Sequence, residues 1–100
     1  MDEAQCCAVS EFLSVLSNPY RVRILCALLD GEQNVSQIAT ALSLSPAHVS
    51  SHLRVLYDRG YVERRRDWRQ VFYSLHRAEI GAFIALASRL TSQSQATTAV

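Results

Sequence analysis

The sequence contains no lysine, only three cysteines and three isolated glycines, and no apolar run long enough to cross a membrane. A bilayer span needs about 20 consecutive apolar residues, so the sequence argues against a membrane protein. An odd and small number of cysteines does not suit a disulfide scaffold and indicates free thiols in a reducing compartment. The glycines (Gly31, Gly60 and Gly81) form no phosphate-cradling loop. The acidic start lacks the plan of a signal peptide, so we expect a cytoplasmic protein.

The basic residues are concentrated in one part of the chain. All ten are arginines, and seven of them lie within residues 45–77, where only three residues are acidic. This segment therefore carries a net charge of +4 and the rest of the chain −3, although the whole protein carries only +1. A basic segment on an almost neutral protein indicates one surface that faces a polyanion.

A helix with both ends marked is predicted between Ser45 and Gly60. Ser45 is a favourable N-cap, Pro46 suits the first helical position, and Gly60 suits the left-handed position after the last turn. One side of this helix carries an apolar stripe: Val49, Leu53 and Leu56. The opposite side carries short or polar residues: Ala47, Ser51, Arg54 and Asp58. A helix this slim on one side can lie in a groove of DNA.

The remaining elements follow from hydrophobic periodicity and from turn residues. Helices are predicted over 2–17, over Tyr20–Asp30, from an Asn34 capping box through Leu42, and over Arg77–Leu90. Tyr61–Arg65 and Arg69–Leu75 alternate as a hairpin with Arg66, Asp67 and Trp68 at its tip. This order predicts one winged helix-turn-helix domain over residues 1–90, mainly α with a β-hairpin wing. The Ser/Thr/Gln/Ala-rich residues 91–100 are predicted to be a disordered tail.

Three stretches of the sequence resemble one known family. They are Leu16–Leu25, Leu44–Leu56 and Gly60–Tyr73, and in combination they resemble the ArsR/SmtB family of small winged-helix repressors. The resemblance implies a homodimer that represses an operator and releases it when a metal ion, a metalloid or a thiol-reactive species acts on the protein. It also implies that the first and last helices form the dimer interface, which suits the apolar stripes of residues 8–16 and 80–90.

The expected partner is double-stranded DNA, with helix 45–59 in the major groove and the hairpin on phosphates or the minor groove. A dimer would bind an inverted repeat whose half-sites lie about one helical turn apart. The candidate contacts from the helix are Ser45, His48, Ser50, Ser51 and Arg54, and those from the hairpin are Arg64, Arg65, Arg66, Arg69 and Gln70. His52 suits a DNA contact and a structural partner equally well. The alternative for the hairpin arginines is a solvated tip.

The cysteines are the candidate effector site. Cys26 lies in an apolar stripe, so it is either a small buried residue or a reactive thiol. The resemblance implies a second cysteine in the last helix, but residues 77–100 contain none. Cys6 and Cys7 sit about 100° apart on a helix, so a disulfide between them would be strained. Our hypothesis is a switch between Cys26 and Cys6 or Cys7, within or across subunits, that senses an oxidant or reactive sulfur. The alternative is binding of As(III) or another soft ion by these thiolates.

Other function classes are less well supported. His48 and His52 have the i, i+4 spacing of a zinc-binding helix, but the glutamate base and a third ligand are missing. The metal-binding motifs of the family are absent from residues 34–42 and from the last helix. We therefore expect no enzyme. The remaining alternative is a winged helix that binds a protein rather than DNA.

Overall fold

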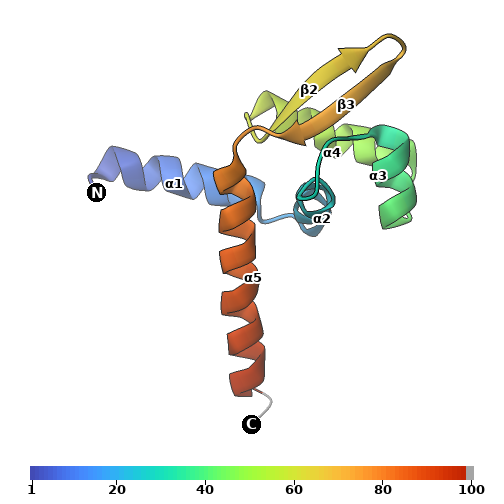
Figure 1. Cartoon of the computed structure of the whole chain (residues 1–100). Coiled ribbons are helices and arrows are strands. Elements are labelled where there is room, and N and C mark those ends of the chain that lie inside the picture. The colour runs from blue at the N-terminus through green and yellow to red at the C-terminus, as the bar shows by residue number, and fades with distance from the viewer. Residues whose placement is uncertain (99–100) are drawn as a thin grey trace.

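The computed structural model describes the backbone of residues 1–98, which forms five helices and one three-stranded antiparallel sheet. In chain order the elements are α1 (Glu3–Val15), α2 (Pro19–Ala27), β1 (Gln33–Asn34), α3 (Val35–Leu42), α4 (Pro46–Asp58), β2 (Val62–Asp67), β3 (Gln70–Leu75) and α5 (Ala78–Thr98). The order confirms the predicted winged helix-turn-helix fold. Helices α3 and α4 form the helix-turn-helix, and β2 and β3 form the wing (Figure 1).

Polar side chains fix where the central helices begin. Asn18, Asn34 and Ser45 cap α2, α3 and α4, and each accepts a hydrogen bond from a backbone N–H of the first turn. Asn34 and Gln37 form a complete capping box, because the Gln37 side chain also accepts from the Asn34 N–H. The starts at Asn34 and Ser45 were predicted from the sequence and are confirmed.

The core lies where α2, α3 and α4 pack together. Six side chains have no accessible surface: Ile24, Leu25, Ile38, Val49, Leu53 and Leu56. The last three are the stripe predicted for α4, which is confirmed. Burying each such side chain contributes about 1.5–3 kcal/mol. The apolar face of α4 is therefore committed to the core, and the orientation of its polar face is fixed.

The sheet has the order β1-β3-β2, and its register corrects the predicted hairpin tip. Arg66 pairs with Val71 and Asp67 pairs with Gln70, so Arg66 and Asp67 belong to the strand β2. The turn is only Trp68 and Arg69. The prediction that Arg66 and Asp67 lie in the tip is therefore wrong, because strand pairing continues up to a two-residue turn. The two-residue strand β1, which pairs with β3, was not predicted.

Two helix ends also differ from the prediction. Helix α2 ends at Ala27, not at Asp30, because the next N–H groups bond three residues back and tighten the chain into turns. Helix α5 continues to Thr98, so its predicted end at Leu90 is wrong and the predicted disordered tail is helical up to Thr98. No glycine or proline interrupts this stretch. Residues 99 and 100 lie outside the described part of the chain.

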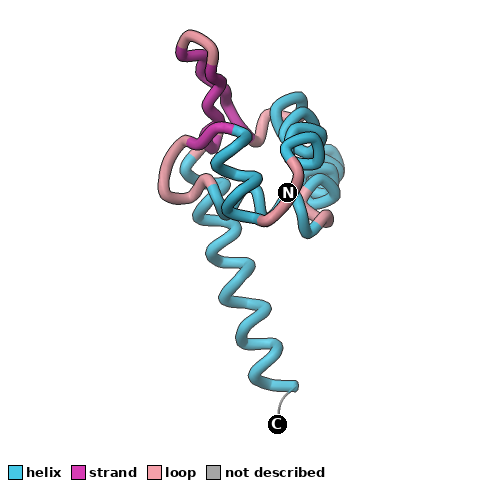
Figure 2. The backbone as a smooth tube through the Cα atoms, turned by 90° about the vertical axis from the view of Figure 1, so that its right-hand side faces the viewer, coloured by secondary structure: helices cyan, strands magenta, loops and turns pink. Residues whose placement is uncertain are grey.

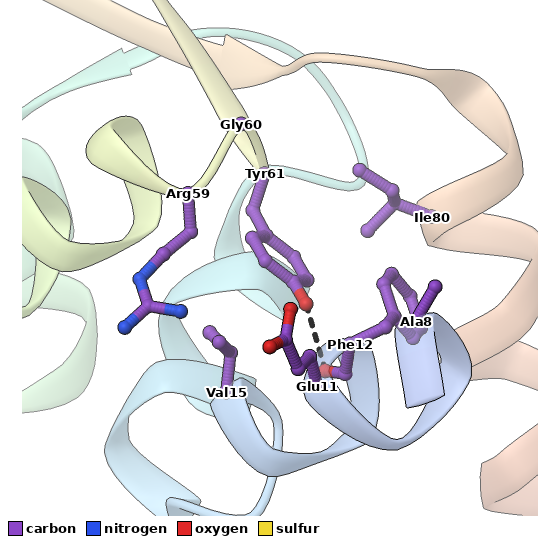
Figure 3. A pocket seen from close by; sticks show the side chains of 8 residues that line it. All are labelled: Ala8, Glu11, Phe12, Val15, Arg59, Gly60, Tyr61 and Ile80. Carbon is purple, nitrogen blue, oxygen red and sulfur yellow. Dashed lines mark hydrogen bonds between the residues drawn. The ribbon is translucent and has the colours of Figure 1, made fainter. Parts of the chain in front are cut away.

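The first and last helices are attached to the rest of the domain through aromatic contacts. Phe12 of α1 stacks on Tyr61 with ring centroids 5.2 Å apart and meets Phe83 of α5 edge-on at 5.3 Å. The Tyr61 hydroxyl donates to the Phe12 carbonyl oxygen over 2.7 Å (Figure 3). Beyond these contacts, α5 extends away from the body on the side opposite the wing (Figures 1 and 2). No helix within residues 1–98 is long and apolar enough to cross a membrane.

Candidate nucleic-acid interface

The polar side of α4 is exposed along its whole length. Ala47, Ser51, Arg54 and Asp58 are all exposed, as predicted from their phase on the helix. The Ser45 oxygen accepts from the His48 N–H at 3.1 Å, which leaves its own hydroxyl hydrogen free to donate outward. Ser51 donates to the His48 carbonyl oxygen and can only accept from an outside partner. The leading end of α4 therefore offers both a donor and an acceptor.

Two histidines of α4 form an aromatic cluster with Tyr20 of α2. The ring centroids of Tyr20 lie 4.5 Å from His48 and 5.7 Å from His52, and the two histidine rings lie 5.0 Å apart. Partial burial, then the neighbouring His48 and Arg21, lower the pKa of His52. His52 therefore packs against Tyr20 and His48, as in the structural one of the two roles that the sequence left open. Within the described residues, no three metal-ligating side chains come together here or elsewhere.

A polar hollow of ≈ 440 Å³ lies between α4 and the wing. The guanidinium of Arg64 lies over the Tyr57 ring, 4.0 Å from its centroid. The hollow is lined by Ser50, Arg54, Tyr57, Asp58, Arg64 and Tyr73. Two arginines, a serine and two tyrosines against one carboxylate make a site suited to an anion such as a DNA phosphate. The structure brings together here three of the predicted contacts.

Other predicted wing contacts lie on the opposite face of the strands. The Arg65 guanidinium binds Glu32 through two hydrogen bonds, Nη2 to Oε1 at 2.6 Å and Nε to Oε2 at 3.2 Å. These bonds lower the pKa of Glu32 and raise that of Arg65. Gln70 accepts a hydrogen bond from Asn34 at 3.1 Å. Arg65 and Gln70 therefore tie the wing to the segment before α3.

The wing ends in Trp68, which the sequence reasoning did not single out as a contact. Its side chain is 82% exposed, and its φ of 58° is unusual for a residue other than glycine. The Arg66 Nε donates to the Trp68 carbonyl oxygen at 3.2 Å, and the Arg69 guanidinium lies 5.2 Å from the indole ring. The only sequence signal was a large aromatic residue within a turn between arginines.

All three cysteines are free and exposed. The interpretation of Cys26 as a small buried residue is therefore wrong for the single chain, although partial burial of its side chain still raises the pKa of the thiol. A raised pKa lowers the fraction of the thiolate, which is the more reactive form. The three thiols do not form a metal-binding group within the described part of one chain.

Comparisons with known proteins agree with this fold. Residues 18–64 match the family described as "Bacterial regulatory protein, arsR family". The transcriptional activator HlyU of Vibrio cholerae is 40% identical over 81 residues, which are 81% of this chain and 75% of HlyU. The structure of reduced HlyU superposes with a TM-score of 0.80 at 36% identity and covers 88% of this chain and 93% of HlyU.

Two further solved structures have the same fold. The antimony-specific transcriptional repressor AntR superposes with a TM-score of 0.84 at 26% identity and covers 94% of this chain and 86% of AntR. The homodimeric winged helix-turn-helix DNA-binding domain of Mb0332 from Mycobacterium bovis gives a TM-score of 0.78 at 25% identity, over 93% and 89% of the two chains.

Proposed function

Because the chain belongs to the ArsR family of bacterial regulatory proteins, we propose that it is a homodimeric repressor whose release from DNA is controlled by its thiols. It is a DNA-binding transcription regulator with a winged helix-turn-helix domain, and it is not an enzyme. The finer proposal is that two copies bind an inverted repeat, with each α4 in a major groove and each wing beside it.

The observation that best supports the proposed DNA-binding surface is the arrangement of α4 and the wing around one polar hollow. Arg54 of α4 and Arg64 of β2 both line this hollow, and Ser50 lies at the same place. A phosphate bound there would fix the depth of α4 in the groove, while Ser45, His48 and Ser51 meet base edges. Arg65 and Gln70 position the wing in this proposal, because both already have partners within the protein.

The proposed partner of α1 and α5 is a second copy of the chain. Large apolar side chains remain exposed on these helices: Val9, Leu13, Phe83, Leu86 and Leu90. A mainly apolar hollow of ≈ 500 Å³ borders them and is lined in part by Phe12, Phe83 and Leu86. Isolated exposed apolar residues are ordinary, but a contiguous apolar patch marks an interaction surface. The homodimeric state of the Mb0332 domain supports this choice of partner.

The proposed switch is oxidation of Cys26 together with Cys6 or Cys7. All three thiols are exposed in the single chain, so a peroxide or a persulfide can reach them. A peroxide would oxidise one thiolate to a sulfenic acid, and attack by the second thiol would form a disulfide and release water. That HlyU was solved in a reduced form supports redox chemistry in a relative. Because α1 belongs to the proposed dimer interface, a disulfide to it would change the relative position of the subunits.

The second candidate is a repressor that responds to a metalloid. AntR is described as antimony-specific, and trivalent metalloids prefer thiolate ligands. Since no three ligands come together within the described residues of one chain, such a site would have to combine thiols from both subunits.

The test begins with selection of binding sites from a randomised pool of duplexes. We expect inverted repeats with half-sites about 10 base pairs apart and an affinity that falls steeply with salt. Hydrogen peroxide should then release the wild-type protein, whereas Cys26→Ser should stay bound. Cys6→Ser and Cys7→Ser identify the second thiol.

Three outcomes decide between the alternatives. Equal release of all three serine variants by peroxide would end the thiol proposal. Release by As(III) under reducing conditions, lost in the cysteine variants, would favour the metalloid sensor. Binding to duplex DNA that is absent even at low salt would favour a winged helix that binds protein.

A further inference from the structure

We propose that Trp68 enters the minor groove beside the α4 site as an apolar wedge and opens a base step there. This inference rests on the proposed DNA-binding function and adds a contact that the arginines alone do not supply. Its starting point is the exposure of the indole, 82%, at the end of the wing. A tryptophan side chain gains more free energy from burial than almost any other, so an indole held in water is suited to a surface that covers it.

The backbone presents Trp68 in a fixed orientation. The β2–β3 pairing runs without a break to Asp67 and Gln70, and Trp68 follows at once as the first residue of the turn. Its φ of 58° lies in the left-handed region, where glycine or asparagine is ordinary and a tryptophan is strained. The hydrogen bond from Arg66 to the Trp68 carbonyl oxygen holds this turn. A two-residue hairpin turn requires a positive φ, so the turn itself determines where the indole lies.

The strands of the wing are anchored as well as its turn. Arg65 binds Glu32, and Gln70 accepts from Asn34, so the strands are tied to the body on the face away from α4. On the other face, Arg64 stacks on Tyr57 of α4. The wing therefore has a fixed position relative to α4. When α4 lies in the major groove, the anchored strands hold Trp68 at a fixed distance from that groove.

The charges around the indole identify the partner as DNA. Arg69 lies over the ring, Arg66 is bonded to the Trp68 carbonyl oxygen, and both carry charges that phosphates on the two sides of a minor groove would neutralise. The Asp67 carboxylate next to the turn lies 3.9 Å from the Arg65 guanidinium, which is already paired with Glu32. Arg66 and Arg69 therefore face one carboxylate and leave a net positive charge around the indole. An apolar protein surface or a lipid interior would not accept these two arginines. A nucleic acid accepts both the cations, on its phosphates, and the indole, against its bases.

The wedge has a consequence for sequence preference. Apolar side chains that enter the minor groove partly unstack one base step and bend the duplex toward the major groove. Pyrimidine–purine steps such as TA and CA unstack most easily. We therefore expect one such step at a constant distance outside each half-site, at a position that no hydrogen bond reads.

Trp68 is the only tryptophan in the chain, so its fluorescence reports this contact directly. The probe is a duplex selected by the protein from a randomised pool, with binding followed independently by the anisotropy of a fluorescein label on the DNA. We expect the indole emission to fall strongly when the protein binds the duplex. We also expect acrylamide to quench the remaining emission much less than it quenches that of the free protein. Full acrylamide quenching in a complex that anisotropy shows to be saturated would overturn the inference and leave the DNA-binding function intact. No anisotropy change at low salt would instead contradict the DNA-binding function itself.

Variants of the turn give a second readout. Trp68→Ala should weaken binding about tenfold, the usual loss for one stacked aromatic, with no change in the salt dependence. Arg69→Gln should instead lower the slope of log affinity against log salt by about one. Trp68→Gly is the folding control, because glycine adopts a positive φ without strain and should bind as weakly as alanine. Unchanged affinity in both Trp68 variants would contradict the wedge.

The DNA can be varied to identify the groove. Replacing the flanking A·T pairs of the selected duplex by G·C adds an amino group to the minor groove, and replacing them by inosine·C does not. For the wild type, we expect weak binding with G·C flanks and restored binding with inosine·C flanks. Trp68→Ala should bind the duplexes with either replacement equally well. Equal losses with both replacements would assign Trp68 to the major groove and overturn the inference.

Discussion

Arg65 of β2 and Glu32, in the segment before β1, are joined by two hydrogen bonds of 2.6 Å and 3.2 Å. The pair crosses from the wing to the body of the domain, on the face of the wing opposite α4. An arginine that is matched by a carboxylate in this way has little charge left for a phosphate. Arg65 therefore differs from its neighbour Arg64, which faces α4, although the two are adjacent in the sequence.

Replacing Glu32 should release Arg65 toward DNA. In Glu32→Gln the guanidinium loses its charged partner, so we expect one more phosphate contact and a slope of log affinity against log salt that is steeper by about 0.9. The measurement is a salt titration of DNA binding. The double variant Glu32→Gln/Arg65→Gln should return the slope to its wild-type value. A slope that stays steep in the double variant would mean that the lost negative charge, and not Arg65, is responsible.

Features that depend on neighbouring residues could be predicted from the sequence. Asn34 with Gln37, and Ser45 with Pro46, mark helix starts through bonds that span three residues, so they need no knowledge of the rest of the chain. The buried stripe of α4 follows from helical spacing alone. The order of these local elements was sufficient to identify the winged helix-turn-helix.

Features that depend on strand register could not be predicted. Arg64 and Arg65 are neighbours in a run of three arginines and so lie on opposite faces of any strand. Only the pairing with Tyr73 and Phe72, and the packing of the wing on α4, show that Arg64 is the one that faces α4. The strand β1 is two residues long and has no pattern of its own. The exposure of Cys26 likewise depends on which face of α2 meets α3 and α4, and a helix that is apolar almost all round does not specify this face.

Ser45 offers a way to separate folding from DNA binding. Ser45→Ala removes the cap of α4 and should lower the free energy of unfolding by about 1 kcal/mol. Ser45→Asp keeps the cap and adds a favourable charge at the helix N-terminus, so its stability in urea should match the wild type. Its affinity for DNA should nevertheless fall about tenfold or more, because the new carboxylate would enter a groove lined by phosphates. Ser45→Asn, which caps without charge, is the matched control, and wild-type affinity in Ser45→Asp would place Ser45 away from the duplex.

His52 makes stability depend on pH between neutral and mildly acidic solution. Its pKa is lower in the folded protein than the ordinary value of about 6.5, mainly because of partial burial. The unfolded chain therefore binds more protons in this range, and stability falls as the pH drops below about 6.5. Glu32, whose pKa is also lowered, loses its contribution only at more acidic pH and does not interfere above pH 5.

The variant His52→Gln should remove this dependence. We expect its melting temperature to fall less than that of the wild type between pH 8 and pH 5.5. In His48→Gln the proton resonances of His52 should titrate at a higher pH than in the wild type, but still below the ordinary value, since burial is the larger cause. Parallel melting curves for His52→Gln and the wild type across this range would contradict the assignment.

The apolar face of α5 gives the sharpest test of the proposed dimer. Leu86 and Leu90 are 48% and 59% exposed in the single chain and share one side of the helix with Phe83. Leu86→Glu would bring two carboxylates into an apolar interface, one from each subunit, and we expect dimerisation to weaken by at least about 100-fold. Ser88→Glu is the matched control, because it adds the same charge on the opposite side of α5. Sedimentation equilibrium measures both: a dimeric Leu86→Glu beside a monomeric Ser88→Glu would move the interface to the other side of the helix.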